Sequence, residues 1–158
     1  MAANTLWSMG RIPRSTLPFG PFHVYSRGVA GSIPFPEDAD KQTMMDLLPS
    51  LGWRRGLVLH VACVMSTHYH AVVEGTNESL SAGMHWVNWA YARAFNEKYG
   101  LHGHVFSERF QARAIEGEER FRRTCDYVLL NPVKAGLCPC AADWPWSYSR
   151  YGLDVVAA

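Results

Sequence analysis

The chain lacks several features that would place it in common classes of protein. No apolar run is long enough to span a bilayer, because histidine or arginine interrupts the longest ones. The first residues, MAANTLWSMGRIPR, contain no apolar core of a secretory signal, and we therefore expect a cytoplasmic protein. Internal repeats and a linker that would split the chain are also missing. Membrane-spanning, secreted and repeat architectures are not expected.

Cysteine is scarce, and its positions do not predict a metal site. Cys63, Cys125, Cys138 and Cys140 show no paired C-x-x-C spacing. The C-P-C at 138–140 is too tight for an ordinary zinc half-site. We expect reduced, structural cysteines.

An excess of charge of one sign is missing as well. The formal net charge is +1, from 15 basic and 14 acidic residues, so composition alone does not predict a nucleic-acid partner. Between Arg93 and Arg123, seven basic residues are mixed with five glutamates. Such a mixture is typical of a solvated, salt-bridged surface, and it leaves room for a local basic stripe.

The remaining composition predicts one globular domain, since 158 residues with 48% hydrophobic and 18% charged side chains can bury a core. Alternation predicts strands at 20–28, 54–65 and 64–75 and a further strand ending near Glu116. In the first of these, Phe22, Val24 and Ser26 share one face. Helical spacing predicts helices at 38–51, 78–99 and 118–131, the last stopped by Pro132. This order predicts an α+β fold with a ferredoxin-like antiparallel sheet and helices packed on it.

The helix predicted at 78–99 has the clearest apolar stripe. Asn77 is the expected N-cap and Gly100 the expected residue just past the end. Trp86 and Trp89 are expected to pack in the core rather than to stack on a ligand.

The stretch VMSTHYHAVVEG, residues 64–75, carries two histidines in an apolar strand. Side chains two residues apart leave a strand on the same face, so His68 and His70 lie side by side and Tyr69 points the other way. Two neutral imidazoles form half of a site for a divalent metal. By itself, this stretch is better explained as a pair of partly exposed histidines on a solvated strand face.

The helix predicted at 118–131 carries a polar face beside its apolar one. At 100° per residue, Tyr127 clusters with Arg120, Arg123, Thr124 and Asn131. Positive surroundings of this kind predict phenolate character for the tyrosine and attraction of phosphate. The Asn131 amide oxygen is a candidate to complete a metal site beside two imidazoles. A surface tyrosine with flanking charges remains the simpler alternative.

Five stretches in order resemble the single-tyrosine HUH transposases, in particular the REP-associated tyrosine transposases. They are FHVYSRG, VMSTHYHAVV, GHVFSERFQA, YVLLNPVKAGL and DWPWSYSRY. The resemblance covers a domain at 20–152, with an N-terminal extension at 1–19 and a tail at 153–158. It implies the HUH nuclease core as the fold and hairpin or single-stranded DNA as the partner.

The resemblance also implies a role for individual residues. Tyr127 is the implied nucleophile, which cuts single-stranded DNA and keeps a 5′-phosphotyrosine link. His68, His70 and Asn131 are the implied ligands of Mg²⁺ or Mn²⁺. The side chains expected to contact DNA are Arg27, Arg109, Arg113, Arg120, Arg123 and Lys134. A monomer is expected rather than a dimer.

Two positions depart from the pattern of the family. Ser66-Thr67 stands before the first histidine, where relatives often have Pro-Asn, which bears on how the ligands are oriented. In the second H-x-H, at 102–104, Gly103 predicts a loop, so we expect His104 to be structural or to contact DNA. Two other functions stay open: a non-catalytic binder of hairpin DNA or RNA, and a metal-dependent enzyme for a small molecule.

Overall fold

The computed structural model describes residues 19–154, and every structural statement below concerns that range. The predicted extension at 1–19, except its last residue, lies outside the described residues, as does the end of the predicted tail. Within the described range, no helix is both long and apolar enough to cross a membrane.

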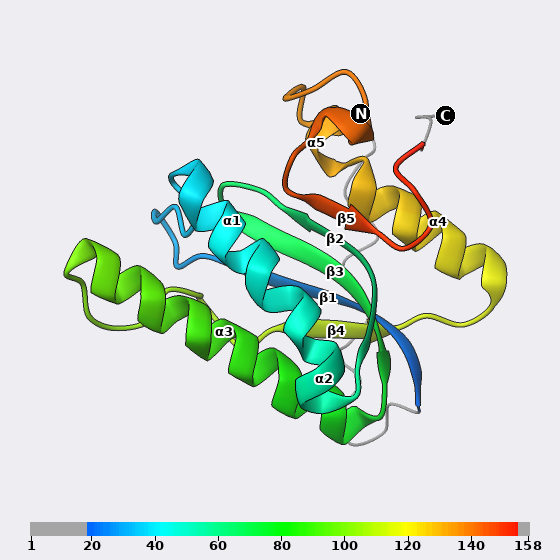
Figure 1. Ribbon diagram of the computed structural model, residues 1–158, viewed down its shortest axis with the longest axis horizontal. Helices are drawn as coiled ribbons and strands as arrows, with labels where there is room; N and C mark the ends of the chain where they lie inside the picture. The colour runs from blue at the N-terminus through cyan, green and yellow to red at the C-terminus, as the bar shows by residue number, and fades with distance from the viewer. Residues whose placement is uncertain (1–18, 155–158) are drawn as a thin grey trace.

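A five-stranded antiparallel sheet forms the centre of the molecule (Figure 1). Its strands lie in the order β4-β1-β3-β2-β5. Two β-α-β units, β1–α1–β2 and β3–α3–β4, interleave in this order, which is the split arrangement of a ferredoxin-like fold. The predicted α+β class is therefore confirmed. The strands span Gly20–Arg27 (β1), Val58–Val64 (β2), His68–Gly75 (β3), Gln111–Ala114 (β4) and Ser147–Ser149 (β5).

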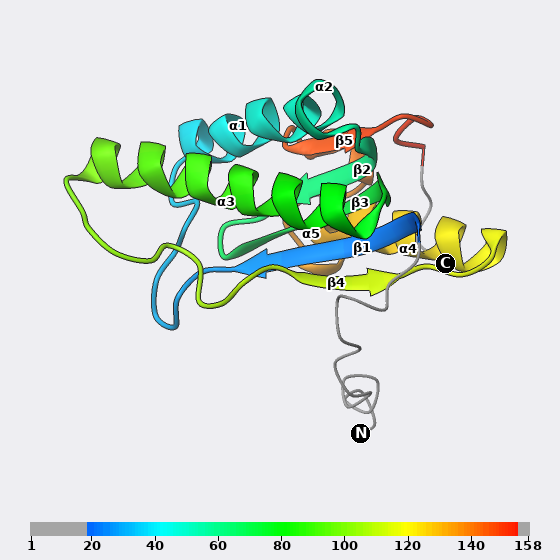
Figure 2. The same ribbon diagram turned by 90° about the horizontal axis from the view of Figure 1, so that it is seen from below.

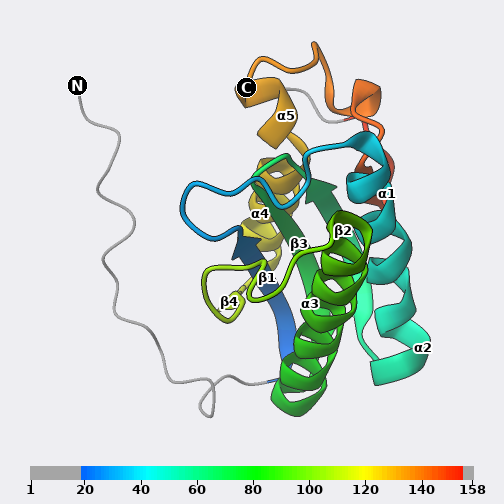
Figure 3. The same cartoon turned by 90° about the vertical axis from the view of Figure 1, so that its left-hand side faces the viewer.

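Helices cover both faces of the sheet (Figures 2 and 3). One face carries the layer that contains α1, α2 and α3, and the other face carries α4. The helices span Asp38–Leu47 (α1), Leu51–Arg55 (α2), Asn77–Tyr99 (α3), Glu118–Leu129 (α4) and Asn131–Lys134 (α5), with short 3₁₀ turns at Leu48–Ser50 (η2) and Ala141–Asp143 (η3).

Strand alternation divides the core into two clusters. Phe22, Val24 and Tyr69 point toward α1 and α3 and belong to the larger cluster. Val61 and Val72 point toward α4 and pack with its buried residues in the smaller cluster. Because both faces of β2 and β3 are covered, most of their residues are buried, and a one-residue slip would exchange the two clusters.

The predicted element types are right, while several boundaries are wrong. Thr76 is the N-cap of α3, one residue before the predicted Asn77, because its hydroxyl accepts the Ser79 amide at 3.1 Å. Gly100 closes this helix in the left-handed region, at φ 63°, as predicted. The helix α4 ends at Leu129 rather than at residue 131. Pro132 does not stop it, since this proline lies in the first turn of α5, where its missing N–H is not needed.

Two further segments differ from the prediction. The helix expected at 38–51 is broken by a 3₁₀ turn at Pro49 and continues as α2. Because α2 includes Arg54 and Arg55, the following strand begins only at Val58. The aromatic segment after residue 136, for which no element was predicted, contributes β5 at the edge of the sheet.

A hydrogen-bonded chain anchors the histidine strand to the helix behind it. Tyr69 is 0% exposed, and its hydroxyl donates to Asn88 Oδ1 of α3 at 2.6 Å. The Asn88 amide then donates to the Ser26 hydroxyl of β1 at 3.0 Å. These hydrogen bonds fix the positions of β1 and β3 relative to α3.

Tyr69→Phe is expected to lower the free energy of unfolding by about 1–3 kcal/mol, because it leaves the Asn88 carbonyl without its donor while changing almost no volume. Urea denaturation measures this difference. The matched control is Tyr148→Phe, which removes a half-exposed hydroxyl and is expected to change stability by less than about 0.5 kcal/mol. Equal losses in the two variants would contradict the anchoring role of Tyr69.

Candidate active site

The histidine pair lies on the face of the sheet that α4 covers. His68 and His70 leave β3 on this face, and Tyr69 leaves on the other, as predicted. The two imidazole rings lie edge to face with centroids 5.0 Å apart. His70 is 3% exposed, whereas His68, at the start of the strand, is half-buried. The pair therefore forms one wall of a partly enclosed site.

The neighbouring strand β1 adds two aromatic side chains that the sequence analysis missed. His23 Nε2 lies 3.0 Å from His70 Nδ1, and the two rings stack with centroids 5.1 Å apart. The Tyr25 ring lies 4.8 Å from the His70 ring and 5.6 Å from the His68 ring. The signal was present in FHVYSR, because His23 and Tyr25 alternate with the apolar positions of that strand.

Tyr127 of α4 reaches the same histidines from above the sheet. Its ring lies edge-on to His70 at 5.6 Å and to His23 at 5.9 Å between centroids. The Lys134 ammonium of α5 lies 5.0 Å from the centroid of the Tyr127 ring. Residues from four separate elements, β1, β3, α4 and α5, thus meet around one tyrosine.

The prediction of phenolate character for Tyr127 is wrong. Burial of the side chain, reinforced by the nearby Tyr25 phenol, raises the pKa of Tyr127 above its ordinary value. The expected cationic neighbour, Arg123, is 77% exposed and forms an ion pair with Glu119 one turn earlier on the same helix. Tyr127 is therefore a neutral phenol at neutral pH.

Burial also keeps the histidines uncharged. It lowers the pKa of His70 to about 2, with further contributions from His23 and His68. Burial, together with the Arg113 guanidinium, lowers the pKa of His23 to about 4. The pKa of His68 is lowered by burial and by Arg27. Neutral imidazole is the form that binds a metal.

The hydrogen bonds of these rings leave one nitrogen of each available. When His70 Nδ1–H donates to His23 Nε2, the lone pair of His70 Nε2 is free. Thr67 Oγ1 lies 2.8 Å from His68 Nδ1, which leaves Nε2 of that ring free in the same way. The departure at Thr67 from the pattern of relatives thus still supplies an orienting partner for the first histidine.

The donor atoms expected to bind a metal are of kinds that a divalent ion accepts. In residues 19–154, no three histidine, cysteine, aspartate or glutamate side chains form a complete metal cluster. The candidate set is two neutral imidazoles and the Asn131 amide. The side-chain nitrogen of Asn131 donates to the Tyr127 carbonyl at 2.9 Å, so Asn131 Oδ1 is the atom left to bind an ion. Such a set needs water or phosphate oxygen to be complete.

The predicted DNA-binding side chains fall into separate regions. Arg27 and Arg113 lie on strand positions facing the histidines, opposite His68 and His23 in the strand pairing. Lys134 lies on the Tyr127 ring. Arg120 and Arg123 are exposed on α4, and Arg109 lines a groove beside α3. Three of the six therefore lie beside the histidines or Tyr127.

The cysteines agree with the sequence-based expectation. All four are free, and Cys63 and Cys125 are buried in the core. The loop predicted at 102–104 is also present, with Gly103 at φ 100°, and His104 is exposed on it.

Comparison with known proteins identifies a solved structure with a similar fold. A scan of protein-family models finds no match, and a search of curated proteins finds none either. Among solved structures, the chain is similar to a REP-associated tyrosine transposase bound to a REP hairpin. The TM-score is 0.67 at 22% sequence identity, and the match covers 88% of this chain and 82% of that chain. The chain thus has the fold of a REP-associated tyrosine transposase, as its sequence motifs imply.

Proposed function

We propose that this protein is a tyrosine transposase of the HUH class that cuts and rejoins single-stranded DNA next to a hairpin. The observation that carries the proposal is the placement of the Tyr127 ring edge-on to His70, 5.6 Å between centroids, within the fold of a hairpin-bound relative. A surface tyrosine would not lie against one buried and one half-buried histidine that are both neutral.

In the proposed reaction, the Tyr127 oxygen attacks the phosphorus of a phosphodiester. The new bond joins the phenolic oxygen to phosphorus, and the bond from phosphorus to the 3′-oxygen breaks. The phenolic proton leaves to solvent, and the departing 3′-oxygen takes up a proton to become a hydroxyl. The DNA strand keeps a 5′-phosphotyrosine link, which a 3′-hydroxyl reverses in the second, joining step without an external energy source.

The residues around Tyr127 each support one part of this reaction. The Lys134 ammonium, 5.0 Å from the ring centroid, stabilises the phenolate as it forms. His68, His70 and Asn131 would hold a Mg²⁺ or Mn²⁺ ion, which supplies polarisation of the phosphate. His23 fixes the orientation of His70 through the hydrogen bond at Nδ1.

The proposed site is complete within one chain. Tyr127 contacts histidines of its own sheet, so a partner is not needed to deliver the nucleophile. This arrangement supports action as a monomer. The alternative function, a hairpin-binding protein without catalysis, shares the DNA surface but needs no reactive tyrosine, and the first test below separates the two.

Tyr127→Phe is expected to abolish a covalent protein–DNA adduct while hairpin binding and stability persist, because only one hydroxyl is lost. The adduct is detected as a shifted band after denaturing electrophoresis with labelled hairpin DNA that carries a single-stranded flank. Tyr148→Phe and Tyr151→Phe are controls that keep the adduct. Mass spectrometry of the nuclease-trimmed adduct must place the nucleotide on the peptide that contains Tyr127. Its location on any other tyrosine would overturn the mechanism.

His68→Ala and His70→Ala are each expected to remove Mn²⁺ binding measured by calorimetry, because each deletes one imidazole ligand. His23→Ala removes only the hydrogen bond that orients the His70 ring, and it is expected to weaken the affinity for Mn²⁺ by about 10–100-fold. His102→Ala serves as the control, since its side chain lies exposed on a loop. Unchanged Mn²⁺ affinity in the His70 variant would refute the assignment of the metal site.

Hairpin binding is expected to weaken with salt. Arg27, Arg113 and Lys134 surround the site, and three phosphate contacts on a single strand give a slope of log affinity against log salt of about −2. Arg27→Gln is expected to reduce the slope by about 0.7. Arg122→Gln should leave it unchanged, because this side chain pairs with Glu118 on α4. A flat salt response measured by fluorescence anisotropy contradicts binding through phosphates.

A further inference from the structure

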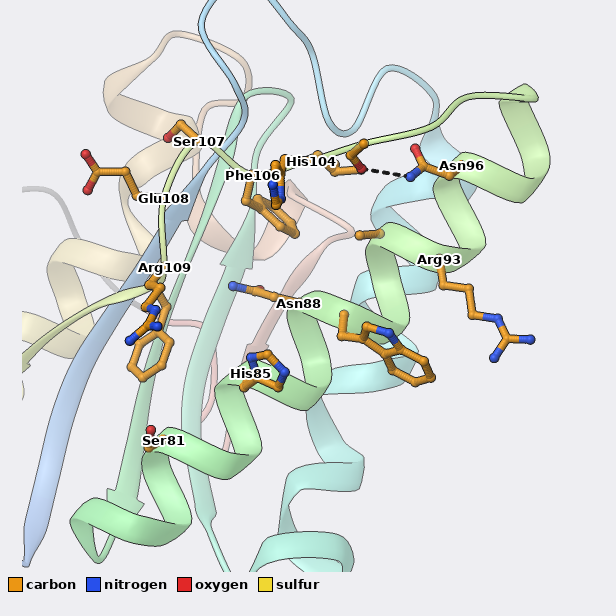
Figure 4. Close-up of a pocket in the computed structure, with 15 residues that line it drawn as sticks. Ser81, His85, Asn88, Arg93, Asn96, His104, Phe106, Ser107, Glu108 and Arg109 are labelled. Atoms are coloured by element: carbon orange, nitrogen blue, oxygen red, sulfur yellow. Dashed lines mark hydrogen bonds between the residues drawn. The ribbon is translucent and has the colours of Figure 1, made fainter.

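A groove of about 780 Å³ lies between α3 and the segment that leads into β4 (Figure 4). Figure 4 shows side chains of α3 on one side and residues 104–109 on the other. Its inner wall includes Asn88, whose amide is already engaged with Tyr69 and Ser26. The groove is therefore preformed, and its rim carries the side chains available to a ligand.

The rim combines an exposed aromatic ring with positive charge. Trp89 is 52% exposed, so the prediction that it packs in the core is wrong, whereas Trp86 does pack there. The Arg93 guanidinium lies 5.6 Å from the centroid of the Trp89 ring. Arg109 adds a second cation from the opposite side, and Glu108 is the acidic member of the described lining.

The groove lies on the face of the sheet that α3 covers, whereas the histidines lie on the other face, and the two regions meet at the end of β1. The Ser107 amide, on the groove wall, donates to the Arg27 carbonyl at 3.0 Å, and Gly28 forms a bridge with Phe106. Arg27 in turn pairs with His68 across the sheet. One end of the groove is thus separated from the candidate active site by the end of a single strand.

We propose that this groove binds the unpaired DNA strand that flanks the hairpin, with a base stacked at Trp89 and phosphates at Arg93 and Arg109; this rests on the proposed function. Unpaired bases present a free ring face to an aromatic side chain, whereas the bases of a duplex are already stacked. A groove that pairs aromatic rings with cations suits a single strand and not a helical stem. A DNA strand that leaves the point of cleavage would reach the groove around the end of β1.

The test measures affinity by fluorescence anisotropy for two labelled DNAs, a blunt hairpin and the same hairpin with a single-stranded flank. The Tyr127→Phe background prevents cleavage during the measurement. Trp89→Leu is expected to weaken binding of the flanked hairpin by about 10-fold and of the blunt hairpin by less than 2-fold. Trp89→Phe, which keeps a ring, is expected to restore most of the loss. Arg109→Gln is expected to reduce the salt slope by about 0.7 for the flanked DNA only.

The matched control is Trp53→Leu. Trp53 is 73% exposed and also lies against a guanidinium, that of Arg54, but it belongs to α2, away from the groove. An equal effect of the two leucine variants, an equal loss for both DNAs, or no loss at all would overturn the proposal. Wild-type adduct formation is scored separately. An adduct without a flank effect refutes the groove alone, and a flank effect without an adduct refutes the catalytic proposal alone.

Discussion

The antiparallel pairing of β1 with β3 is the constraint on which the rest of the site depends. Eight residue pairs, from Gly20 with Gly75 to Arg27 with His68, join the two strands. This register places Tyr25 opposite His70 and brings His23 within hydrogen-bond distance of the same ring. Because a strand alternates strictly between two faces, a shift of one residue would turn both histidines of β3 toward α3.

Side-chain contacts hold β3 in place on both of its faces, although only one face carries the candidate site. Behind it, the Tyr69 hydroxyl is bonded to Asn88, which also holds Ser26. In front of it, His70 is bonded to His23 and covered by Tyr127. A rigid strand with fixed side chains is what a metal site requires, since misplacement of a ligand weakens binding.

Burial gives the site an electrically neutral resting state. The imidazoles are uncharged, and the Tyr127 phenol keeps its proton because burial raises its pKa. Positive charge stands around this centre, on Arg27, Arg113 and Lys134. In the proposed reaction, an arriving phosphate would be attracted by these cations, while the neutral histidines would stay free to bind a metal ion.

Periodicity predicted the element types and the common face of His68 and His70, because those depend on local geometry. Helix ends were predicted less well, since the N-cap at Thr76 and the break at Pro49 depend on single hydrogen bonds and on packing. His23 was not predicted because the alternation of β1 identifies its buried apolar face, whereas the role of the other face depends on its pairing with β3. The charge environment of Tyr127 was misjudged because Arg123 turns to Glu119, a choice between partners that helical spacing does not decide.

The short outer strands bear on how the molecule meets other copies of itself. β4 has four residues and β5 three, against seven or eight in each of the central strands. A short outer strand offers few unpaired backbone groups, and the Arg113 guanidinium on β4 adds charge there. Growth of the sheet by addition of a further chain is thereby discouraged.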